Sequence, residues 1–205
     1  MLRFDKRAPN EMRQIQIVKG LCRGSQGSSR VSIGNTQVIV NIVGPRECKI
    51  HDIDTGKVQL KVRSYPETNN INQIVADAVN NSLDLTAYPD SLLEISITIA
   101  GNEGSLSCCA INATILALID SGLQMKRLTC AISFALKDEK IWLDPTDREE
   151  IVGDGHVTFL VEKESRTVFG TYFQGHARPE MIQAALTNAT LNGDDSPAGI
   201  WFSYF

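Results

Sequence analysis

A long and almost entirely apolar stretch between two glycine turns is the strongest constraint on how this chain folds. It runs from residue 101 to residue 123, GNEGSLSCCAINATILALIDSGL, and nearly every side chain in 108–119 is apolar or small. A helix that is apolar on all sides has no face suited to water and must be buried. Gly122 stands where the chain can leave such a helix in a left-handed turn. We therefore expect a central helix held between two sheets.

Alternation of apolar and polar residues predicts strands on both sides of this helix. Gly34-Asn35 supplies the positive φ angles of a tight hairpin within 30–45, and Pro179 suits a first helical turn. Helices that follow groups of antiparallel strands indicate α+β layers rather than a doubly wound α/β fold. The expected strands cover residues 13–23, 30–45 (two runs), 57–65, 91–101, 128–136, 141–144, 156–162 and 167–175, and the other expected helices cover 71–85 and 178–191.

Composition is that of an ordinary globular protein, with 42% apolar and 21% charged residues. No apolar run reaches the roughly 18–20 residues that span a bilayer, and the first residues lack the apolar segment of a secretory signal. The cysteines are odd in number and lack metal-ligand spacing, so we expect buried thiols in a reducing compartment. They are Cys22, Cys48, Cys108, Cys109 and Cys130.

Charge is distributed unevenly along the chain. Residues 1–63 carry 12 lysines and arginines against 5 acidic residues, whereas residues 64–205 carry 8 against 19. A basic third on an acidic body favours a face for a polyanion or for an acidic neighbour. The alternative is that these cations are scattered over a solvated surface.

The start of the apolar helix has the features of an anion site, but one of them is missing. Ser105 or Ser107 can cap the helix by accepting a hydrogen bond from a free backbone N–H, and the helix dipole favours an anion there. Binding of phosphate usually adds an arginine as a planar clamp. The neighbouring position holds Leu106, and no arginine lies between Arg63 and Arg127. Local sequence therefore favours a capping serine over an active anion site.

Four stretches together resemble the ribonuclease PH-like proteins, and in particular the eukaryotic exosome ring subunits that derive from ribonuclease PH. They occur in the same order and span nearly the whole chain: DKRAPNEMRQIQIVKG, GNTQVIVNIVGP, GSLSCCAINATILALIDSGL and WLDPTDREE. The resemblance implies one ribonuclease PH-like domain over residues 1–205. Its α+β fold would consist of mixed β-sheets packed with a buried central helix and flanking helices.

Active members of that family are phosphorolytic exoribonucleases that bind phosphate through a Gly-Thr-Arg motif at this helix. The matching residues here are Gly104, Ser105 and Leu106, so the hydroxyl is kept and the guanidinium is lost. A second phosphate-binding arginine is also missing, because the matching stretch PETNNINQIV contains none. The catalytic acidic pair of the family matches Asp144 and Glu150. Two such carboxylates could hold magnesium, or DPTDREE could be a polar turn.

These departures predict a non-catalytic ring subunit of an RNA exosome, with no catalytic residue, metal or cofactor. Ser105, Asp144 and Glu150 would be vestiges of the site. The basic residues expected to contact RNA are Arg3, Lys6, Arg7 and Arg13, although Arg7 and Arg13 could equally pair with acids of their own chain.

The implied partners are RNA, other ribonuclease PH-like subunits in a hetero-hexameric ring, S1/KH cap subunits and an associated nuclease. The implied locations are nucleus, nucleolus and cytoplasm. The alternatives are a phosphorolytic or metal-dependent exoribonuclease acting as a homodimer, and a plain RNA-binding module.

The last six residues, IWFSYF, include four aromatic side chains. A chain end with so many aromatic side chains needs a place to dock. We expect it to close the core or to face a partner, unless it marks a shortened chain.

Overall fold

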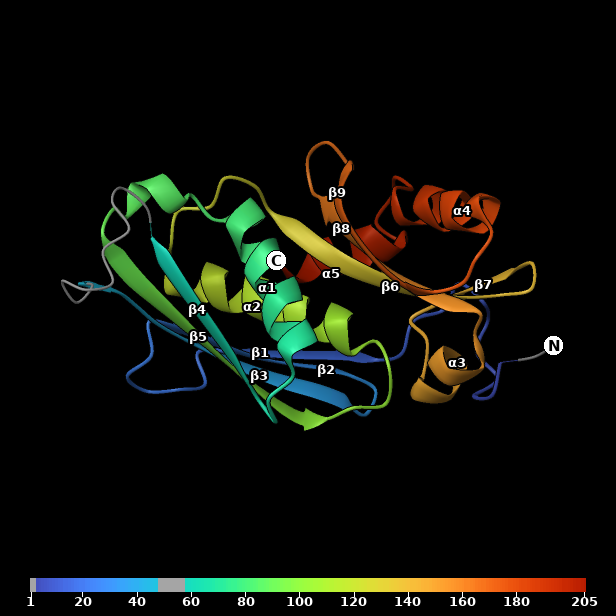
Figure 1. The fold of residues 1–205 in the computed structure, drawn as a ribbon, viewed down its shortest axis with the longest axis horizontal. Coiled ribbons are helices and arrows are strands. Elements are labelled where there is room, and N and C mark those ends of the chain that lie inside the picture. The colour runs from blue at the N-terminus through green and yellow to red at the C-terminus, as the bar shows by residue number, and fades with distance from the viewer. Residues whose placement is uncertain (1–2, 48–57) are drawn as a thin grey trace.

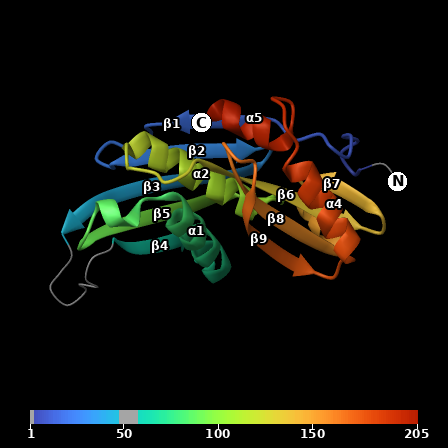
Figure 2. The ribbon, with the colours of Figure 1, turned by 90° about the horizontal axis from the view of Figure 1, so that it is seen from above.

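Two β-sheets with a helix between them form the centre of the molecule (Figures 1 and 2). The computed structural model describes residues 3–47 and 58–205, so Cys48 lies outside the described residues. The first sheet has the strand order β1-β2-β3-β5-β4 and the second has β7-β6-β8-β9. The expected α+β fold of mixed β-sheets around a central helix is confirmed.

The first sheet is built mainly from hairpins. Its strands are β1 (Ile15–Lys19), β2 (Gly27–Ile33), β3 (Thr36–Glu47), β4 (Gln59–Tyr65) and β5 (Ser91–Gly101). Gly34, with a φ of 56°, lies in the turn that pairs Ile33 with Thr36, as the sequence predicted. β4 and β5 run parallel, and the helix α1 (Asn69–Ser82) makes the crossover between them. The short 3-10 helix η2 (Leu85–Ala87) precedes β5.

The second sheet is antiparallel throughout its described pairings. It contains β6 (Thr129–Lys137), β7 (Lys140–Leu143), β8 (Gly155–Glu162) and β9 (Val168–Gly175). The short helix α3 (Asp147–Val152) connects β7 to β8, and α4 (Pro179–Ala189) packs on β6, β7 and β8. None of the helices in the described ranges is long and apolar enough to cross a membrane.

The central helix α2 (Leu106–Ser121) lies between the sheets and contacts β2, β3 and β6. Its side chains from Cys108 to Leu118 are all buried, and Gly122 ends it with a φ of 71°. The predicted buried helix and its left-handed end are therefore confirmed.

One buried polar side chain fixes this helix against the second sheet. The Asn112 amide donates to the Ala131 carbonyl over 2.9 Å and accepts from the Ala131 N–H over 2.8 Å. Both polar ends of Asn112 are thus satisfied where water does not reach, which makes their burial tolerable.

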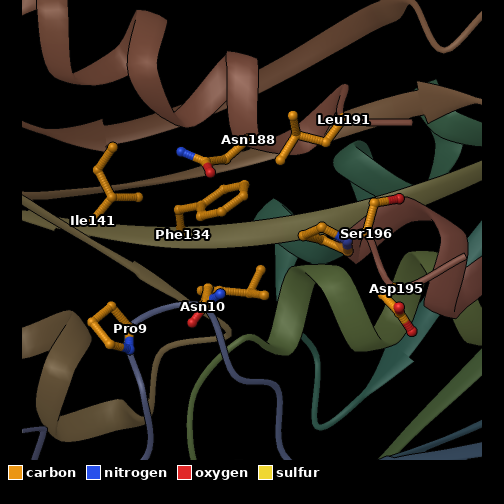
Figure 3. A pocket seen from close by; sticks show the side chains of 10 residues that line it. Pro9, Asn10, Phe134, Ile141, Asn188, Leu191, Asp195 and Ser196 are labelled. Carbon is orange, nitrogen blue, oxygen red and sulfur yellow. The ribbon is translucent and has the colours of Figure 1, made fainter. Parts of the chain in front are cut away.

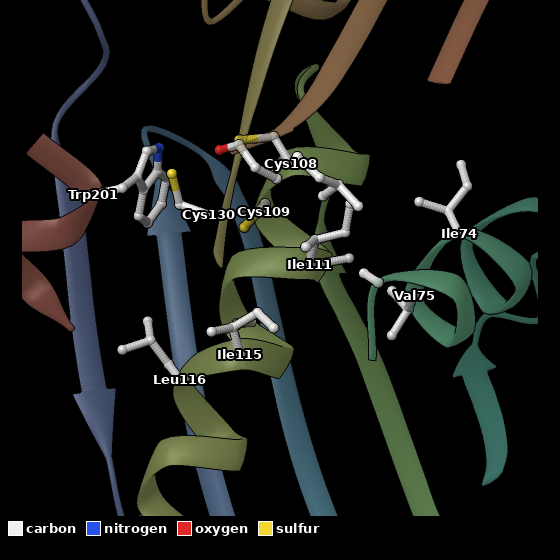
Figure 4. Close-up of a cluster of buried hydrophobic side chains, with 14 of the residues drawn as sticks. Ile74, Val75, Cys108, Cys109, Ile111, Ile115, Leu116, Cys130 and Trp201 are labelled. Carbon is white, nitrogen blue, oxygen red and sulfur yellow. The ribbon is translucent and has the colours of Figure 1, made fainter. Parts of the chain in front are cut away.

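Three cysteines line the same core. Cys108, Cys109 and Cys130 are buried near Ile111 and Trp201 (Figure 4). Burial raises the pKa of the Cys109 thiol to about 12 and raises the pKa values of the other two. They behave as small apolar side chains rather than nucleophiles.

The aromatic end of the chain folds as helix α5 (Pro197–Tyr204), which contacts β6 and α4. Trp201 is fully buried and Phe202 is 6% exposed. Trp201 and Phe202 thus close part of the core, whereas Tyr204 is 40% exposed.

Candidate functional site

The loop before α2 is pressed against the turn that follows β7. Gly104 has a φ of 92°, and a Cβ atom there would lie 2.4 Å from the Asp147 backbone nitrogen. Only glycine allows this approach at this backbone conformation. Ser105 follows with a φ of 54° and is 2% exposed. The sharp double turn brings the start of α2 directly to residues 144–150.

Ser105 does not cap α2 with its side chain, in contrast to the expectation from sequence. Its hydroxyl donates instead to the Pro145 carbonyl oxygen over 3.0 Å, and its backbone N–H donates to Glu150 Oε1 over 2.8 Å. The left-handed conformation of Ser105 explains the difference, because a capping residue normally has an extended backbone. The hydroxyl and the N–H that would contact a bound anion are therefore both engaged within the chain.

Glu150 reaches Ser105 because residues 147–152 form the helix α3 rather than the polar turn considered from sequence. Burial raises the pKa of Glu150, although the Ser105 N–H and Arg13 favour its charged form. The carboxylate lies at the positive end of the 16-residue helix α2, a position that favours negative charge. Glu150 is thus an internal anion at the site where the resemblance places phosphate.

Asp144 is occupied by arginines of its own chain. It is 2% exposed, and its carboxylate accepts hydrogen bonds from Arg13 Nε at 2.8 Å, Arg13 Nη2 at 2.6 Å and the Arg13 backbone N–H at 2.9 Å. Arg7 Nη1 lies 3.3 Å from the same carboxylate. A carboxylate paired in this way is a poor metal ligand because its lone pairs already face N–H donors. In residues 3–47 and 58–205, no group of three or more His, Cys, Asp or Glu side chains could hold a metal ion.

A third acid, Glu149, was not singled out from the sequence. It is fully buried and receives a two-pronged bond from Arg3, with Nε to Oε1 at 2.9 Å and Nη2 to Oε2 at 2.8 Å. Arg3 also donates to the carbonyl oxygens of Leu143 and Asp144. Burial would raise the pKa of Glu149, but the bonds from Arg3 and Thr146 outweigh it and lower the pKa.

Three of the four arginines and lysines expected to contact RNA are therefore in internal ion pairs. Arg3 pairs with Glu149, Arg7 with Asp5 and Asp144, and Arg13 with Asp144. Pairing with acids of the same chain was the alternative that the sequence left open for Arg7 and Arg13. Lys6 is exposed, and among the described residues it has no ion-pair partner. RNA contact by Lys6 stays a prediction.

No guanidinium takes the place of the missing clamp in the part of the chain that the structure describes. Arg13 reaches the loop, but it donates to the carbonyl oxygens of Glu103 and Gly104 rather than leaving its N–H groups open. The start of α1 has Thr68 at its cap and Glu67 before it, with no arginine. The start of α2 thus keeps backbone N–H groups that could face an anion. Among the described residues, no unpaired arginine lies there to balance the anion's charge.

Comparison with known proteins places these features in a family. Residues 11–124 match the model of the 3′ exoribonuclease family, domain 1, and residues 127–189 match that of domain 2 of the same family. An exosome complex component Rrp41 of Pyrobaculum neutrophilum is 29% identical over 171 residues, which cover 75% of this chain and 70% of that protein. The exosome complex exonuclease RRP46 homolog of Arabidopsis thaliana is 29% identical over 156 residues, covering 72% and 65%.

Solved structures share the fold. Rice Rrp46 superposes with a TM-score of 0.82 at 22% identity, covering 90% of this chain and 91% of that chain. The exosome of Archaeoglobus fulgidus with RNA bound to the active site gives a TM-score of 0.80 at 20% identity, covering 100% and 92%.

Proposed function

The chain belongs to the 3′ exoribonuclease family with the ribonuclease PH fold, and on this premise we propose that it is a non-catalytic ring subunit of an RNA exosome. The family and the fold are those expected from the sequence. The relatives named above as exosome components support a place in such a ring. The absence of catalysis is the finer part of the proposal and rests on the site itself.

The proposed absence of catalysis is inferred from the hydrogen bond that the Ser105 N–H donates to Glu150. An anion attacking RNA from this position would have to displace a carboxylate of the protein. It would then meet Leu106 where the family has an arginine. Phosphate attacking a phosphodiester brings two negative groups together, so preorganised cations supply most of the stabilisation. Losing one such donor typically costs about 2.7–4 kcal/mol, or ~10²–10³ in rate.

The role of the subunit would then be to build the ring by pairing with other subunits. The first sheet ends in β1 and β4 and the second in β7 and β9, and such strand edges can pair with another chain. The proposed partners are further ribonuclease PH-like subunits, S1/KH cap subunits, a nuclease carried by the complex, and RNA passing through it. Nucleus, nucleolus and cytoplasm are the proposed locations.

A second candidate function is 3′-to-5′ exoribonuclease activity. It is favoured by the family itself and by the full-length superposition on an exosome structure described with RNA at its active site. For this function Glu150 would have to leave Ser105, and a partner subunit would have to bring the missing cations. The pair of Asp144 and Glu150 does not fit a metal here, because both carboxylates are engaged.

The test is phosphorolysis by the purified full chain, measured as release of nucleoside diphosphates from an RNA oligonucleotide in phosphate and magnesium. We expect none from the wild type. Leu106→Arg combined with Glu150→Ala restores a cation and frees the N–H groups, so this variant should bind phosphate more tightly than Leu106→Met with Glu150→Ala, the matched control without the cation. Neither double variant should release diphosphates, because Glu150 belongs to the acidic pair. Diphosphate release by the wild type that Glu150→Gln abolishes would instead establish the enzyme.

A further inference from the structure

The positive charge concentrated in residues 1–63 is only partly neutralised within the fold. Arg3, Arg7 and Arg13 pair with acids of their own chain. A hollow of about 250 Å³ beside the N-terminal loop carries none of this charge, because the described residues that line it include Asp195 and no lysine or arginine (Figure 3). Further cations lie on the first sheet, whose five strands contain five lysines and arginines and two acids.

The first sheet has one covered face and one open face. α1 and α2 pack on the covered face, where Val31, Val40 and Ile97 are fully buried. No helix of the described ranges lies over the opposite face (Figure 1). Because successive side chains of a strand point to opposite faces, Arg30 and Ser96, which precede Val31 and Ile97, point away from the helices. We call this surface the open face.

One row of side chains across the open face has a cation near one end and an aromatic ring at the other. Arg30 on β2 pairs with Ile39 on β3. On the other side of Ile39 the row continues with Thr98 on β5 and Tyr65 on β4. Three strand spacings of about 4.8 Å separate Arg30 from Tyr65, which is roughly 14 Å. Tyr65 is 54% exposed, so its ring is available for stacking with a base.

The next row along the sheet is polar and also ends in a cation. Asn41 on β3 pairs with Ser96 on β5, and Ser96 pairs with Arg63 on β4. Arg63 is exposed and Arg30 is half-buried. Neither guanidinium has an ion pair or a hydrogen bond with another described residue. Their N–H donors are therefore free to bind a ligand.

The open face carries more cations than acids. Arg46 and Lys61 point to it and share Glu94, with N–O distances of 2.6 Å and 3.7 Å. These three residues together keep one positive charge, and Arg30 and Arg63 add two. Glu94 is the one acid that the described strands of this sheet direct to the open face. A surface with this excess attracts a polyanion.

The side chains of the open face suit a nucleic acid strand better than a protein surface. Its apolar residues are separated by polar ones, as Ile39 and Val43 are by Asn41 along β3, whereas the centre of a protein interface is a contiguous apolar patch. Unpaired guanidinium groups contact phosphates, and hydroxyl and amide side chains contact phosphates and sugars. An exposed aromatic ring adds stacking with an unpaired base.

We infer that the open face of the first sheet binds single-stranded RNA. Phosphates would contact Arg30 and Arg63, a base would stack on Tyr65, and the strand would cross β3 and β5 between them. That the ligand is RNA rests on the proposed function, since the sheet itself selects a single strand with phosphates and bases. The surface is separate from the Ser105 site, because it lies on the side of the sheet opposite α2.

The test is fluorescence anisotropy of a labelled adenosine 12-mer RNA with the purified full chain, in EDTA and without phosphate, so that turnover does not contribute. We expect a Kd of roughly 10⁻⁴–10⁻⁶ M at physiological salt, the range of sequence-independent binding. Each phosphate contact adds about 0.7 to the slope of log K against log salt for a single strand. Arg30→Gln and Arg63→Gln should each lower that slope by about 0.7 and weaken binding about fivefold, the upper range for an exposed charge pair.

Variants of Tyr65 test the stacking separately from the charge. Tyr65→Leu should weaken binding at least about fivefold, the low end for loss of one base–aromatic stack, and leave the salt slope unchanged. Tyr65→Phe keeps the ring and should bind like the wild type. Lys163→Gln and Arg148→Gln remove exposed cations from other parts of the chain and should change the affinity less than about twofold.

Three results would overturn this inference: no binding by the wild type, equal losses in the open-face and control variants, and competition by a glutamate 12-mer as strong as that by RNA. The last result would assign the face to an acidic protein. All three leave the proposed ring function untouched, because ring assembly and diphosphate release are measured separately. Diphosphate release by the wild type, with binding that depends on Arg30 and Arg63, would overturn the proposed function and support the RNA surface.

Discussion

The backbone N–H of Ser105 donates a hydrogen bond of 2.8 Å to Glu150, so a carboxylate of the protein lies at the start of its central helix. The N-terminus of a helix attracts anions through free N–H groups and the helix dipole. Here the first backbone bond within the helix runs from the Cys109 N–H to the Ser105 carbonyl oxygen. The N–H groups of residues 106–108 therefore precede the helical ladder, and Glu150 is the negative charge next to them.

Removing that carboxylate should open the position to inorganic anions. Relative to chloride at equal ionic strength, we expect phosphate to raise the melting temperature of the wild type only by the general stabilisation that an excluded kosmotropic anion gives a folded protein. In Glu150→Ala, phosphate should raise it further, because a ligand that binds only the folded state stabilises by RT ln(1 + [L]/Kd). With phosphate at about ten times its Kd this amounts to ~1.4 kcal/mol. Asp147→Asn, on the same helix and exposed, is the control and should behave like the wild type.

The buried pair of Arg3 and Glu149 should make stability depend on acid pH. The folded-state pKa of Glu149 lies below its ordinary value of 4.5, so the unfolded chain binds the proton more readily. The stabilisation is then present above the unfolded-state pKa and is lost as the pH falls through the folded one. Glu149→Gln should cost about 3–5 kcal/mol at pH 7, the usual cost of breaking a buried ion pair, and less near pH 3.

Urea unfolding at a series of pH values measures how the free-energy cost of Glu149→Gln changes with pH. The exposed Glu164 serves as the comparison, and Glu164→Gln should change the free energy of unfolding by less than about 0.5 kcal/mol at any pH. A cost for Glu149→Gln that is the same at pH 3 and pH 7 would mean that packing, rather than ionisation, is responsible.

Asp144→Asn should lower the free energy of unfolding. Its carboxylate joins Arg13 and Arg7 to the turn after β7, and an asparagine amide would point donors at a guanidinium. We expect a loss of about 3 kcal/mol or more in the free energy of unfolding. The surface pair of Arg46 and Glu94 gives the matched control, since Arg46 is 53% exposed, and Glu94→Gln should cost less than about 1 kcal/mol. Equal costs for the two variants in urea unfolding would contradict a structural role for Asp144.

Sequence patterns predicted the features of this fold that depend on local geometry. The hairpin at Gly34, the buried helix and its end at Gly122 each follow from neighbouring residues. The helix α3 was missed because the proline and acids of DPTDREE suggested a turn. The spacing of Thr146 and Glu149 is nevertheless that of a capping box, and the Thr146 N–H does donate to Glu149 Oε2 over 2.9 Å.

The partners of the N-terminal arginines could not be predicted in the same way. Arg3 and Glu149 are separated by 146 residues, and Arg13 and Asp144 by 131. Charge patterning reports how many cations a segment has, but an ion pair across the fold depends on which surfaces the topology brings together. The same limit applies to Glu150, whose contact with Ser105 depends on two turns with positive φ, at Gly104–Ser105 and at Asp144.

The packing of α2 on β2 should tolerate no side chain at Gly27. A Cβ atom there would lie 2.3 Å from the Ala117 carbonyl oxygen and 2.6 Å from the Ser121 backbone nitrogen. Both are backbone atoms of a helix held on its other side by β6, so neither can move without shifting a sheet. We expect Gly27→Ala to cost about 3 kcal/mol, the upper end for overpacking.

Gly122→Ala separates this steric effect from backbone strain. Nothing lies within 4 Å of a Cβ atom at Gly122, but its φ is 71°, and a left-handed non-glycine residue costs about 1–2 kcal/mol. Thermal or urea unfolding of the two variants should therefore rank Gly27→Ala as the more destabilised. The opposite order would mean that α2 can move away from β2, and that the central helix is less firmly held than its buried side chains indicate.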